Sequence, residues 1–259
     1  MCPAVGVPTE LPGMSQALTE YLARYRRTYV QTKVRLLLAM LGGVSPGTRV
    51  LDYGAGGGFM SLLCAKRGAR VVVVEADEGE LTAARELLKL HGLERNCEFF
   101  LSTSLPADLH SSVFDIIIAK DLLEHVEEDL PLVRSFAASQ LAGGRLLVST
   151  QNSRSLNYLL EGVYYNRWRL GRKDWCGWDD THIRFYTPRS LQRLLQDAGY
   201  AVRKWGGNFI VPYGIVQWLT FGRIRVLFPS FSRFDLALGR VYPFCMLGWN
   251  LLALAERKT

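Results

Sequence analysis

A glycine-rich segment after Asp52 is the first part of this sequence whose residues are arranged for chemistry. Asp52 ends a short apolar run, and Gly54, Gly56 and Gly58 follow it at alternate positions. Glycine allows positive φ angles and a close approach of the backbone to a ligand, and the amides of a following helix suit a carboxylate or a phosphate. The dinucleotide fingerprint requires a glycine where Phe59 stands, and no Gly-Lys-Ser/Thr follows as in a phosphate loop. The segment therefore predicts a ligand-binding turn of another type.

A second acidic residue, Glu75, directly follows the β-branched run 71–74. In a parallel sheet the end of this strand lies beside the glycine turn, where a carboxylate can accept hydrogen bonds from both hydroxyls of a ribose. Together the two features predict a nucleoside ligand whose anionic tail is bound by backbone amides. The alternative is a tight turn and an unrelated surface carboxylate.

A third polar group, Asp121, Glu124 and His125, follows the apolar run 114–119. Their i, i+3 and i+4 spacing places them on one face if this segment is helical. His125 is the candidate general base, because histidine alone titrates near neutrality without help. The alternative is a structural histidine bonded to the loop backbone. The group also suits a divalent cation with His182 as a fourth ligand, although we favour a site without a metal.

The segment 151–187 is aromatic and basic, with few helix or strand signals. We expect it to cover the pocket in which the substrate binds. Asp179, Asp180 and His182 could orient a hydroxyl or an ammonium group, although Asp180 could equally cap the next turn. Aromatic side chains could form the wall of an apolar or ring-shaped acceptor pocket, or could belong to the core. They are Tyr164, Tyr165, Trp168 and Trp175.

The elements that must position these residues alternate between strand and helix. This alternation predicts an α/β fold with a doubly wound, Rossmann-like, mostly parallel seven-stranded sheet. The expected strands are 49–53, 71–74, 97–101, 114–119, 144–150, 200–205 and 248–256, and the expected helices are 14–41, 57–67, 78–91, 128–141 and 188–198. We expect an N-terminal helical cap (1–48) and a Rossmann-like domain (49–259) with lid insertions at about 151–187 and 208–245.

Composition limits the class of protein. The chain has 259 residues, of which 49% are hydrophobic and 21% charged, and it can bury a full core. The five cysteines are scattered without a CxxC pair, which argues against a disulfide framework or a thiolate zinc site and predicts a reducing, cytoplasmic compartment. The first residues lack the basic and apolar regions of a signal peptide.

The net charge of +7 is unevenly distributed, because residues 1–150 are slightly acidic overall and residues 151–259 are strongly basic. A basic half favours an anionic substrate, a membrane surface or a nucleic acid, or is simply a solvated surface. The apolar segment 208–245 is interrupted by Arg223 and Arg225 too early to span a bilayer. It could lie on a membrane or contact a lipid-like acceptor, or it could cover the edge of the sheet.

Four segments in this order carry a resemblance to a known family. They are VLDYGAGGG, VVVVEAD, FDIIIAKDLLEHV and LAGGRLLVST, within residues 48–152. This part of the chain resembles the class I S-adenosylmethionine-dependent methyltransferases. Within that class it is most similar to the ubiquinone-biosynthesis-like enzymes and to those that modify sugars, lipids or natural products. A weaker likeness covers THIRFYTPRSLQRLLQDAGY at 181–200.

The resemblance implies where S-adenosylmethionine would bind. The methionine part would contact the glycine turn, the ribose would contact Glu75, and the adenine would lie near the residues that follow it. The implied cofactor-binding residues are Asp52, Gly54, Ala55, Gly56, Glu75, Ala76, Asp77, Thr103 and Lys120. Thr103 and its two neighbouring serines stand where many family members have an acidic residue, so this sequence would offer hydroxyls to the adenine. Tyr29 or Arg35 would close over the cofactor from the N-terminal helices.

The resemblance also implies methylation of a small-molecule acceptor, with oxygen as the favoured atom and carbon and nitrogen as alternatives. His125, Asp121, Glu124 and His182 are then the candidate catalytic residues. A similar acidic-x-x-Glu-His group binds a metal in some ubiquinone O-methyltransferases, which keeps a divalent cation as an alternative. Residues 119–122 do not match the NPPY-type stacking motif, which argues against a nucleic-acid methyltransferase. The alternative from another class is a non-catalytic protein of the same fold that binds a partner.

Overall fold

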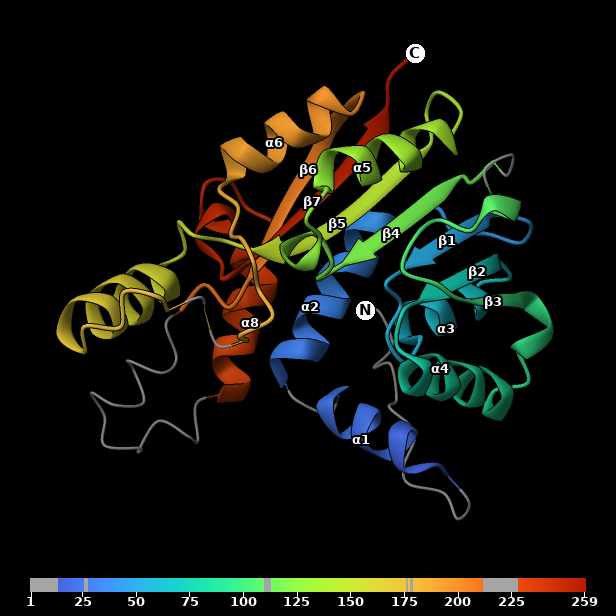
Figure 1. Cartoon of the computed structure of the whole chain (residues 1–259), viewed down its shortest axis with the longest axis horizontal. Coiled ribbons are helices and arrows are strands. Elements are labelled where there is room, and N and C mark those ends of the chain that lie inside the picture. The colour runs from blue at the N-terminus through green and yellow to red at the C-terminus, as the bar shows by residue number, and fades with distance from the viewer. Residues whose placement is uncertain (1–13, 26–27, 110–112, 176, 178, 212–227) are drawn as a thin grey trace.

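The structure, a computed structural model, describes residues 14–25, 28–109, 113–175, 177, 179–211 and 228–259 (Figure 1). Its centre is one seven-stranded sheet with the order β3-β2-β1-β4-β5-β7-β6. The strands are β1 Arg49–Tyr53, β2 Arg70–Glu75, β3 Cys97–Leu101, β4 Ile116–Lys120, β5 Arg145–Gln151, β6 Tyr200–Asn208 and β7 Asn250–Arg257. β7 lies between β5 and β6 and is antiparallel to both, whereas the pairs from β3 to β5 are parallel. The predicted doubly wound, mostly parallel sheet is confirmed.

Helices cover both faces of this sheet. The α-helices are α1 Gln16–Tyr25, α2 Thr28–Leu41, α3 Phe59–Ala65, α4 Glu78–Leu90, α5 Asp129–Ala138, α6 Pro188–Asp197 and α8 Phe228–Leu238. Short 3-10 turns include η3 Leu123–His125 and η6 Phe244–Leu247. In Figure 1 the N-terminal helices and α8 lie on one side of the strands, and α5 and α6 lie on the other.

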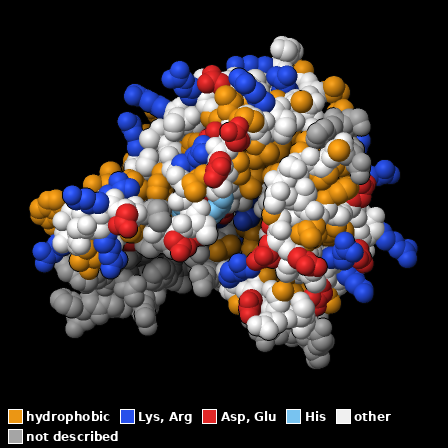
Figure 2. Space-filling view, viewed as in Figure 1, with side chains coloured by type: hydrophobic (Ala, Val, Ile, Leu, Met, Phe, Trp, Pro, Cys, Tyr) orange, Lys and Arg blue, Asp and Glu red, His pale blue; other side chains and the backbone are white. Residues whose placement is uncertain are grey.

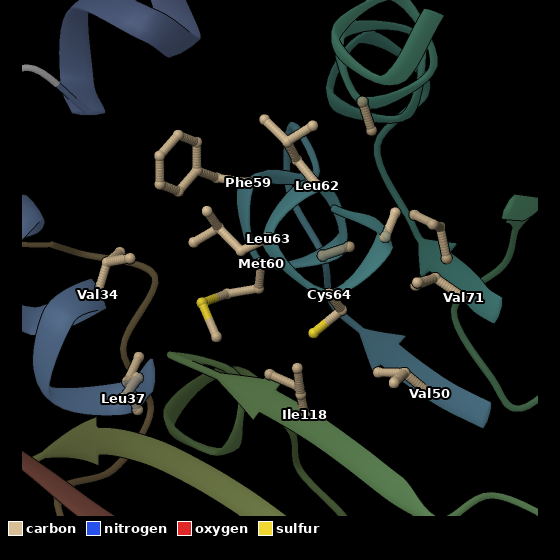
Figure 3. Close-up of a cluster of buried hydrophobic side chains, with 14 of the residues drawn as sticks. Val34, Leu37, Val50, Phe59, Met60, Leu62, Leu63, Cys64, Val71 and Ile118 are labelled. Atoms are coloured by element: carbon tan, nitrogen blue, oxygen red, sulfur yellow. The ribbon is translucent and has the colours of Figure 1, made fainter. Parts of the chain in front are cut away.

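The alternation of side chains along each strand divides the core into two clusters. Val50, Val71 and Ile118 point to one face, where side chains of α1, α2, α3 and α4 cover them. Figure 3 shows this cluster, with Phe59 and Met60 of α3 packed toward α2. The intervening strand residues point to the other face, against α5 and α6. The N-terminal helices therefore share a core with the sheet that carries the glycine turn.

Two segments differ from their predicted secondary structure. The helical pattern of 14–41 forms two helices, α1 and α2, rather than one. The segment 151–187, expected to be irregular, contains a π-helix, η4 Tyr158–Arg169, which extends away from the sheet in Figure 1. A π-helix has no distinctive residue pattern, so the sequence offered little to predict it.

The insertion 208–245 is only partly described. It includes α8 and the start of η6, whereas 212–227, with Arg223 and Arg225, lie outside the described residues. β6 continues to Asn208, three residues beyond the predicted end of this strand. Among the described residues, no helix has the length and apolar character needed to cross a membrane.

Candidate functional site

The glycine turn at the end of β1 has the backbone geometry that its sequence predicts. Gly54, Gly56 and Gly58 have φ angles of 69°, 55° and 75°, in the region that favours glycine. Asp52 is buried just before the turn, and its Oδ2 accepts a hydrogen bond of 2.5 Å from Ser61 Oγ of α3. Burial raises the pKa of Asp52 to about 6, although the Ser61 hydrogen bond opposes this change. Asp52 thus ties the turn to the first helix after it.

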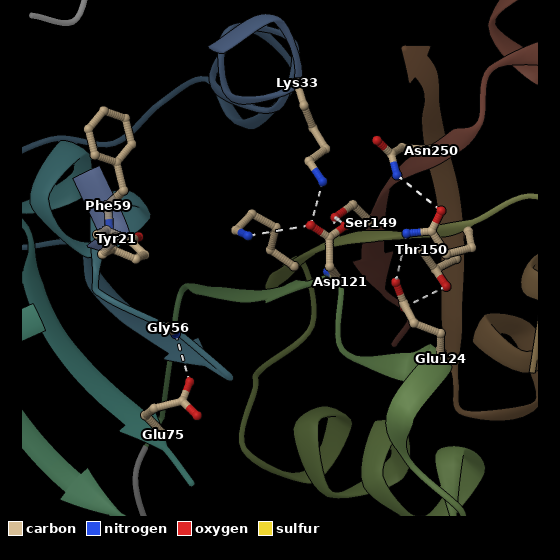
Figure 4. A network of polar contacts seen from close by, with 12 residues as sticks. Tyr21, Lys33, Gly56, Phe59, Glu75, Asp121, Glu124, Ser149, Thr150 and Asn250 are labelled. Carbon is tan, nitrogen blue, oxygen red and sulfur yellow. Dashed lines mark hydrogen bonds and ion pairs between the residues drawn. The ribbon is translucent and has the colours of Figure 1, made fainter. Parts of the chain in front are cut away.

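Glu75, at the end of β2, joins two loops (Figure 4). Its Oε2 accepts a hydrogen bond of 2.7 Å from the amide of Gly56. Its Oε1 accepts hydrogen bonds of 2.8 Å and 3.1 Å from the amides of Ala76 and Asp77. Asp77 in turn caps α4 by accepting from the Glu80 amide. The carboxylate therefore lies beside the glycine turn, as the sequence predicts, and it also organises the start of α4.

Thr103, which the resemblance places near the adenine, lies just beyond the end of β3 and is exposed. Its carbonyl accepts a hydrogen bond of 3.1 Å from Tyr53 Oη. The hydroxyl of the neighbouring Ser102 donates to the carbonyl of Ser104. The loop thus follows β3 and lies beside the end of β2, where the Ser102 amide donates a 2.8 Å hydrogen bond to the Glu75 carbonyl, and the threonine side chain is available to solvent.

Two tyrosines of α1 cover the glycine turn. Tyr21 Oη accepts a 3.0 Å hydrogen bond from the amide of Phe59, the first residue of α3. A Cβ at Gly57 would lie 2.5 Å from the Tyr21 ring, so this position requires glycine as long as the ring lies there. The rings of Tyr21 and Tyr25 are 4.6 Å apart, and both side chains are buried. Neither tyrosine is among the residues that the sequence predicts for the site.

The prediction for the N-terminal helices named two other residues. Arg35 is exposed on α2, and the side chain of Tyr29 lies outside the described part of the chain. The residue of α2 that reaches the end of β4 is Lys33, which is buried and forms an ion pair with Asp121. Lys33 and Arg35 are two positions apart, which is about 200° around the helix, so one faces inward and the other outward.

Asp121 follows β4 and lies between two lysines (Figure 4). Its Oδ2 is bound by Lys33 Nζ and lies 3.4 Å from Lys120 Nζ. Its Oδ1 accepts a 2.7 Å hydrogen bond from Ser149 Oγ of β5. Burial alone would raise the pKa of Asp121, but the two lysines hold it well below its usual range. The side chain is therefore an ionised partner of Lys33.

Lys120 faces the same cluster. Its Nζ lies 5.9 Å from the centroid of the Tyr25 ring as well as near Asp121. Burial lowers the pKa of Lys120, but Tyr25, Asp121 and Asp52 together raise it above its ordinary value. The charged ammonium of this predicted cofactor-binding residue thus faces Asp121 and Tyr25.

Glu124 points in another direction, toward β5. It is fully buried, and its Oε2 accepts a 2.7 Å hydrogen bond from Thr150 Oγ1. Burial and the nearby charge of Asp121 raise the pKa of Glu124 to about 7, although the Thr150 hydrogen bond lowers it. Asp121 does not share a face with Glu124 and His125, because η3 is a single 3-10 turn and Asp121 has a φ of 52°. The expected i, i+3, i+4 arrangement does not form.

The two histidines that sequence reasoning named lie together. The ring centroids of His125 and His182 are 4.9 Å apart. His125 is exposed, and its Nδ1 lies 3.2 Å from the Thr181 carbonyl and 3.1 Å from Thr181 Oγ1. Thr181 Oγ1 donates a 2.6 Å hydrogen bond to Asp179 Oδ1. Figure 2 shows histidine side chains beside a hollow in the middle of the molecule.

His182 is the more buried of the two, with 9% of its surface exposed. Burial lowers its pKa, and the neighbouring His125 lowers it further, so the ring is neutral. Ligand atoms of Glu124, His125 and His182 all lie within 4.8 Å of one another. This trio differs from the predicted group, because His182 takes the place of Asp121.

Aromatic side chains surround His182. Phe185 lies 6.0 Å from His182 and packs with Tyr158, Trp175 and Trp249 at centroid distances of 4.9, 6.4 and 5.9 Å. Of the four aromatic residues expected at the acceptor, only Trp175 belongs to this group. The other three lie on the outer surface of η4, with exposed fractions of 54%, 51% and 71% for Tyr164, Tyr165 and Trp168.

A comparison with protein families identifies the chain. A family model described as a methyltransferase domain matches residues 22–204. The chain belongs to this methyltransferase family. The matched range begins in α1 and ends in β6, so it includes Tyr25, Lys33, the glycine turn, Glu75 and both histidines.

Curated relatives of this methyltransferase include ubiquinone biosynthesis O-methyltransferases. The protein of Aeromonas salmonicida is 33% identical over 172 residues, which are 64% of this chain and 68% of that protein. The protein of Aliivibrio fischeri is 36% identical over 161 residues, which are 61% of this chain and 65% of that protein. The similarity therefore covers about two thirds of each protein.

Solved structures share the fold at low sequence identity. An S-adenosylmethionine-dependent methyltransferase from Mesorhizobium loti has a TM-score of 0.56 and 19% identity, over 87% of this chain and 98% of that one. The [4+2]-cyclase SpnF has a TM-score of 0.60 and 17% identity, over 89% of this chain and 82% of that one. Because a cyclase has the same fold, the fold alone does not define the reaction.

The protein is thus a methyltransferase by family, and its site has features that fit S-adenosylmethionine as the methyl donor. The three glycines of the turn have left-handed φ angles that favour glycine, and a Cβ at Gly54 would also approach Leu122 Cδ1 to 2.9 Å. Glu75 lies beside this turn with a carboxylate that can accept hydroxyl hydrogen bonds.

Proposed function

We propose that this methyltransferase methylates a hydroxyl oxygen of a small, apolar or ring-shaped acceptor, with His125 as the general base. The glycine turn, Glu75, Asp77 and Thr103 would hold S-adenosylmethionine, which supplies an electrophilic methyl group. The protein must then place the acceptor hydroxyl in line with that group and remove its proton. The observation that carries the proposal is the pair of histidines at the carboxyl end of the sheet, 4.9 Å apart between ring centroids.

The contacts of His125 define which of its nitrogens can accept a proton. Thr181 Oγ1 donates its hydrogen to Asp179, so it accepts from His125 Nδ1, as does the Thr181 carbonyl. His125 Nδ1 therefore carries the hydrogen, and Nε2 keeps its lone pair. Asp179 and Thr181 position the imidazole in the way that a third group orients the base in hydrolytic triads. The acceptor proton would move to Nε2.

The surroundings of His182 support an apolar acceptor. His182 is neutral and lies against Phe185, whose ring packs among Tyr158 and Trp249. A wall of aromatic rings beside a neutral imidazole favours a planar, weakly polar molecule over a strongly hydrated one. The curated relatives named ubiquinone biosynthesis O-methyltransferases are consistent with oxygen as the acceptor atom.

Replacement of His125 by alanine tests the proposal. We expect kcat to fall about 100-fold, which is typical for loss of a general base, while the affinity for S-adenosylmethionine measured by calorimetry changes less than about twofold. His91→Ala is the matched control, since His91 lies at the end of α4, where its Nδ1 is 2.9 Å from the Leu87 carbonyl. Assays with catechol-like, sugar and lipid-like acceptors would define the acceptor class. Retention of full activity in His125→Ala would contradict the assignment of the base.

A divalent cation is a second way to acidify the acceptor, because Glu124, His125 and His182 offer one oxygen and two nitrogens within 4.8 Å. We favour the mechanism without a metal, since Thr150 already donates a 2.7 Å hydrogen bond to Glu124. Activity should then survive treatment with a chelator. Loss of activity with a chelator, and recovery after addition of one divalent metal, would replace the His125 base mechanism by metal-assisted deprotonation.

A further inference from the structure

A groove lies along β6, the edge strand of the sheet, and it is separate from the donor and histidine sites. Its volume is about 810 Å³, within the range of small-molecule sites. Elements that are distant in the sequence form its walls, namely the loop after β5, the start of η4, the start of α6, β6 and η6. Figure 1 shows the red segment before β7 beside α6 and β6, whereas most of η4 extends away from the sheet.

One part of this groove is apolar. Trp205 of β6 is half-buried in it, and Leu159 and Met246 come from η4 and η6. Tyr242 lies at its rim and is 76% exposed. A second, smaller groove of about 320 Å³ shares Trp205 and Tyr242 and is also lined by Lys204 and Arg240, so the two grooves meet at the edge of the strand. An exposed surface of this kind costs solvation free energy until an apolar group covers it.

The other part of the groove is cationic. Arg154 and Arg189 line it, and both are exposed. Neighbouring arginines face carboxylates, as Arg193 faces Asp197 and Arg203 faces Glu256. Among the described residues no carboxylate pairs with Arg154 or Arg189, and the sequence of 212–227 contains no Asp or Glu.

The start of α6 adds to this positive potential. Arg189 lies in the first turn of the helix, and that turn contains no acidic residue. The amino end of a helix is itself partly positive and normally favours acidic residues, so an arginine there is unfavourable unless an anion compensates it. The groove thus contains two arginines that pair with no carboxylate of the described residues. The start of α6 and the ring of Trp205 also line it.

We propose that this groove binds an anionic amphiphile, a single acyl or isoprenoid chain with a phosphate or carboxylate head. The head would lie against Arg154 and Arg189, where guanidinium groups can donate paired hydrogen bonds to its oxygens. The chain would cover Trp205, Tyr242 and Met246. The proposal does not depend on the identity of the methyl acceptor, because none of these residues belongs to the donor site or to the histidine pair.

Calorimetric titration of the whole protein tests recognition of the head. The probes are decyl phosphate below its micelle concentration, decyl maltoside as a neutral amphiphile of the same chain length, and inorganic phosphate. We expect saturable binding of decyl phosphate alone. Arg189→Gln should weaken it about tenfold, whereas Arg193→Gln, on the same helix but outside the groove, should change it less than about twofold. Equal binding of decyl maltoside or of inorganic phosphate, or equal effects of the two substitutions, would overturn the proposal.

Fluorescence quenching locates the chain. A bromine-labelled undecyl phosphate should quench the emission of Trp205, so Trp205→Phe should remove the saturable quenching and Trp168→Phe should retain it. Trp168 is the matched control because it is 71% exposed on η4 and does not line the groove. If Trp205→Phe lowers the melting temperature, Tyr242→Ala at the exposed rim replaces it and should weaken binding. Quenching that survives Trp205→Phe, or binding unchanged in Tyr242→Ala, contradicts the assignment.

Discussion

The role of Asp52 could be predicted from the sequence only in part. Its position before the glycine turn was clear, but its burial and its hydrogen bond to Ser61 depend on how α3 packs against β1. The same is true of Lys33, which is one polar residue among many in a basic helix and becomes distinctive only through its ion pair with Asp121. Site residues that directly follow a strand could be predicted from the sequence. Residues that reach the site from a separate helix could not, because their position depends on how that helix packs against the sheet.

The raised pKa of Asp52 predicts a pH dependence of stability. The folded protein holds a proton on this carboxyl up to about pH 6, whereas the ordinary value is 3.8, so stability should fall as pH rises between these values and stay lower above them. Asp52→Asn removes this loss. We expect its free energy of unfolding, relative to the natural protein, to be about 3 kcal/mol more favourable at pH 8 than at pH 3, measured by urea denaturation. The same difference at both pH values would contradict burial of an ionisable Asp52.

At the scale of elements, strands were the most predictable part of the fold. The β-branched run 71–74 and the apolar run 114–119 became β2 and β4, because a buried parallel strand needs such residues on both faces. The π-helix η4 could not be predicted, and neither could the position of α1 over the glycine turn. Both depend on contacts between segments that are remote in sequence, such as Tyr21 with Gly57 and Phe59.

The contact between α1 and the glycine turn can be tested with a double-mutant cycle. Gly57→Ala places a Cβ 2.5 Å from the Tyr21 ring, and we expect it to lower the free energy of unfolding by about 1–3 kcal/mol. The backbone of Gly57 has no positive φ, so the ring is the source of the effect. In a Tyr21→Ala background the same substitution should cost less by about 1 kcal/mol or more. Additive effects in urea denaturation would show that the ring does not lie there.

For the molecule as a whole, the alternation of strands and helices predicted a doubly wound sheet. It did not predict how the insertion after β6 packs against this sheet. Buried polar groups anchor the insertion after β6. Asp235 of α8 is 1% exposed and accepts hydrogen bonds of 2.9 Å and 3.0 Å from the amides of Phe209 and Ile210. Asn152 donates to the Met246 and Gly248 carbonyls, each at 2.9 Å. No local pattern marks such pairs, because their members lie far apart along the chain.

Asp235→Ala should therefore destabilise the insertion that contains α8, together with the end of β6. Its loss leaves two amides without their acceptor, and we expect the free energy of unfolding to fall by about 2–4 kcal/mol. Hydrogen exchange should accelerate in α8 and at the end of β6 while the amides of β1 and β2 stay protected. Asp197→Ala is the control, since its carboxylate faces Arg193 at 3.9 Å on an exposed surface and should cost less than about 1 kcal/mol. Similar losses in both variants would argue against the anchoring role of Asp235.

The position of β7 has a consequence for the order of assembly during synthesis. β5 and β6 are not neighbours in the sheet, since β7, made after both, lies between them and pairs with each. Until Asn250–Arg257 leaves the ribosome, the edge of β5 is open and β6 with the basic groove has no strand to join. The strands β1 to β4 can pair earlier, so the glycine turn and Glu75 would be in place in a nascent chain before β6 and β7 complete the sheet.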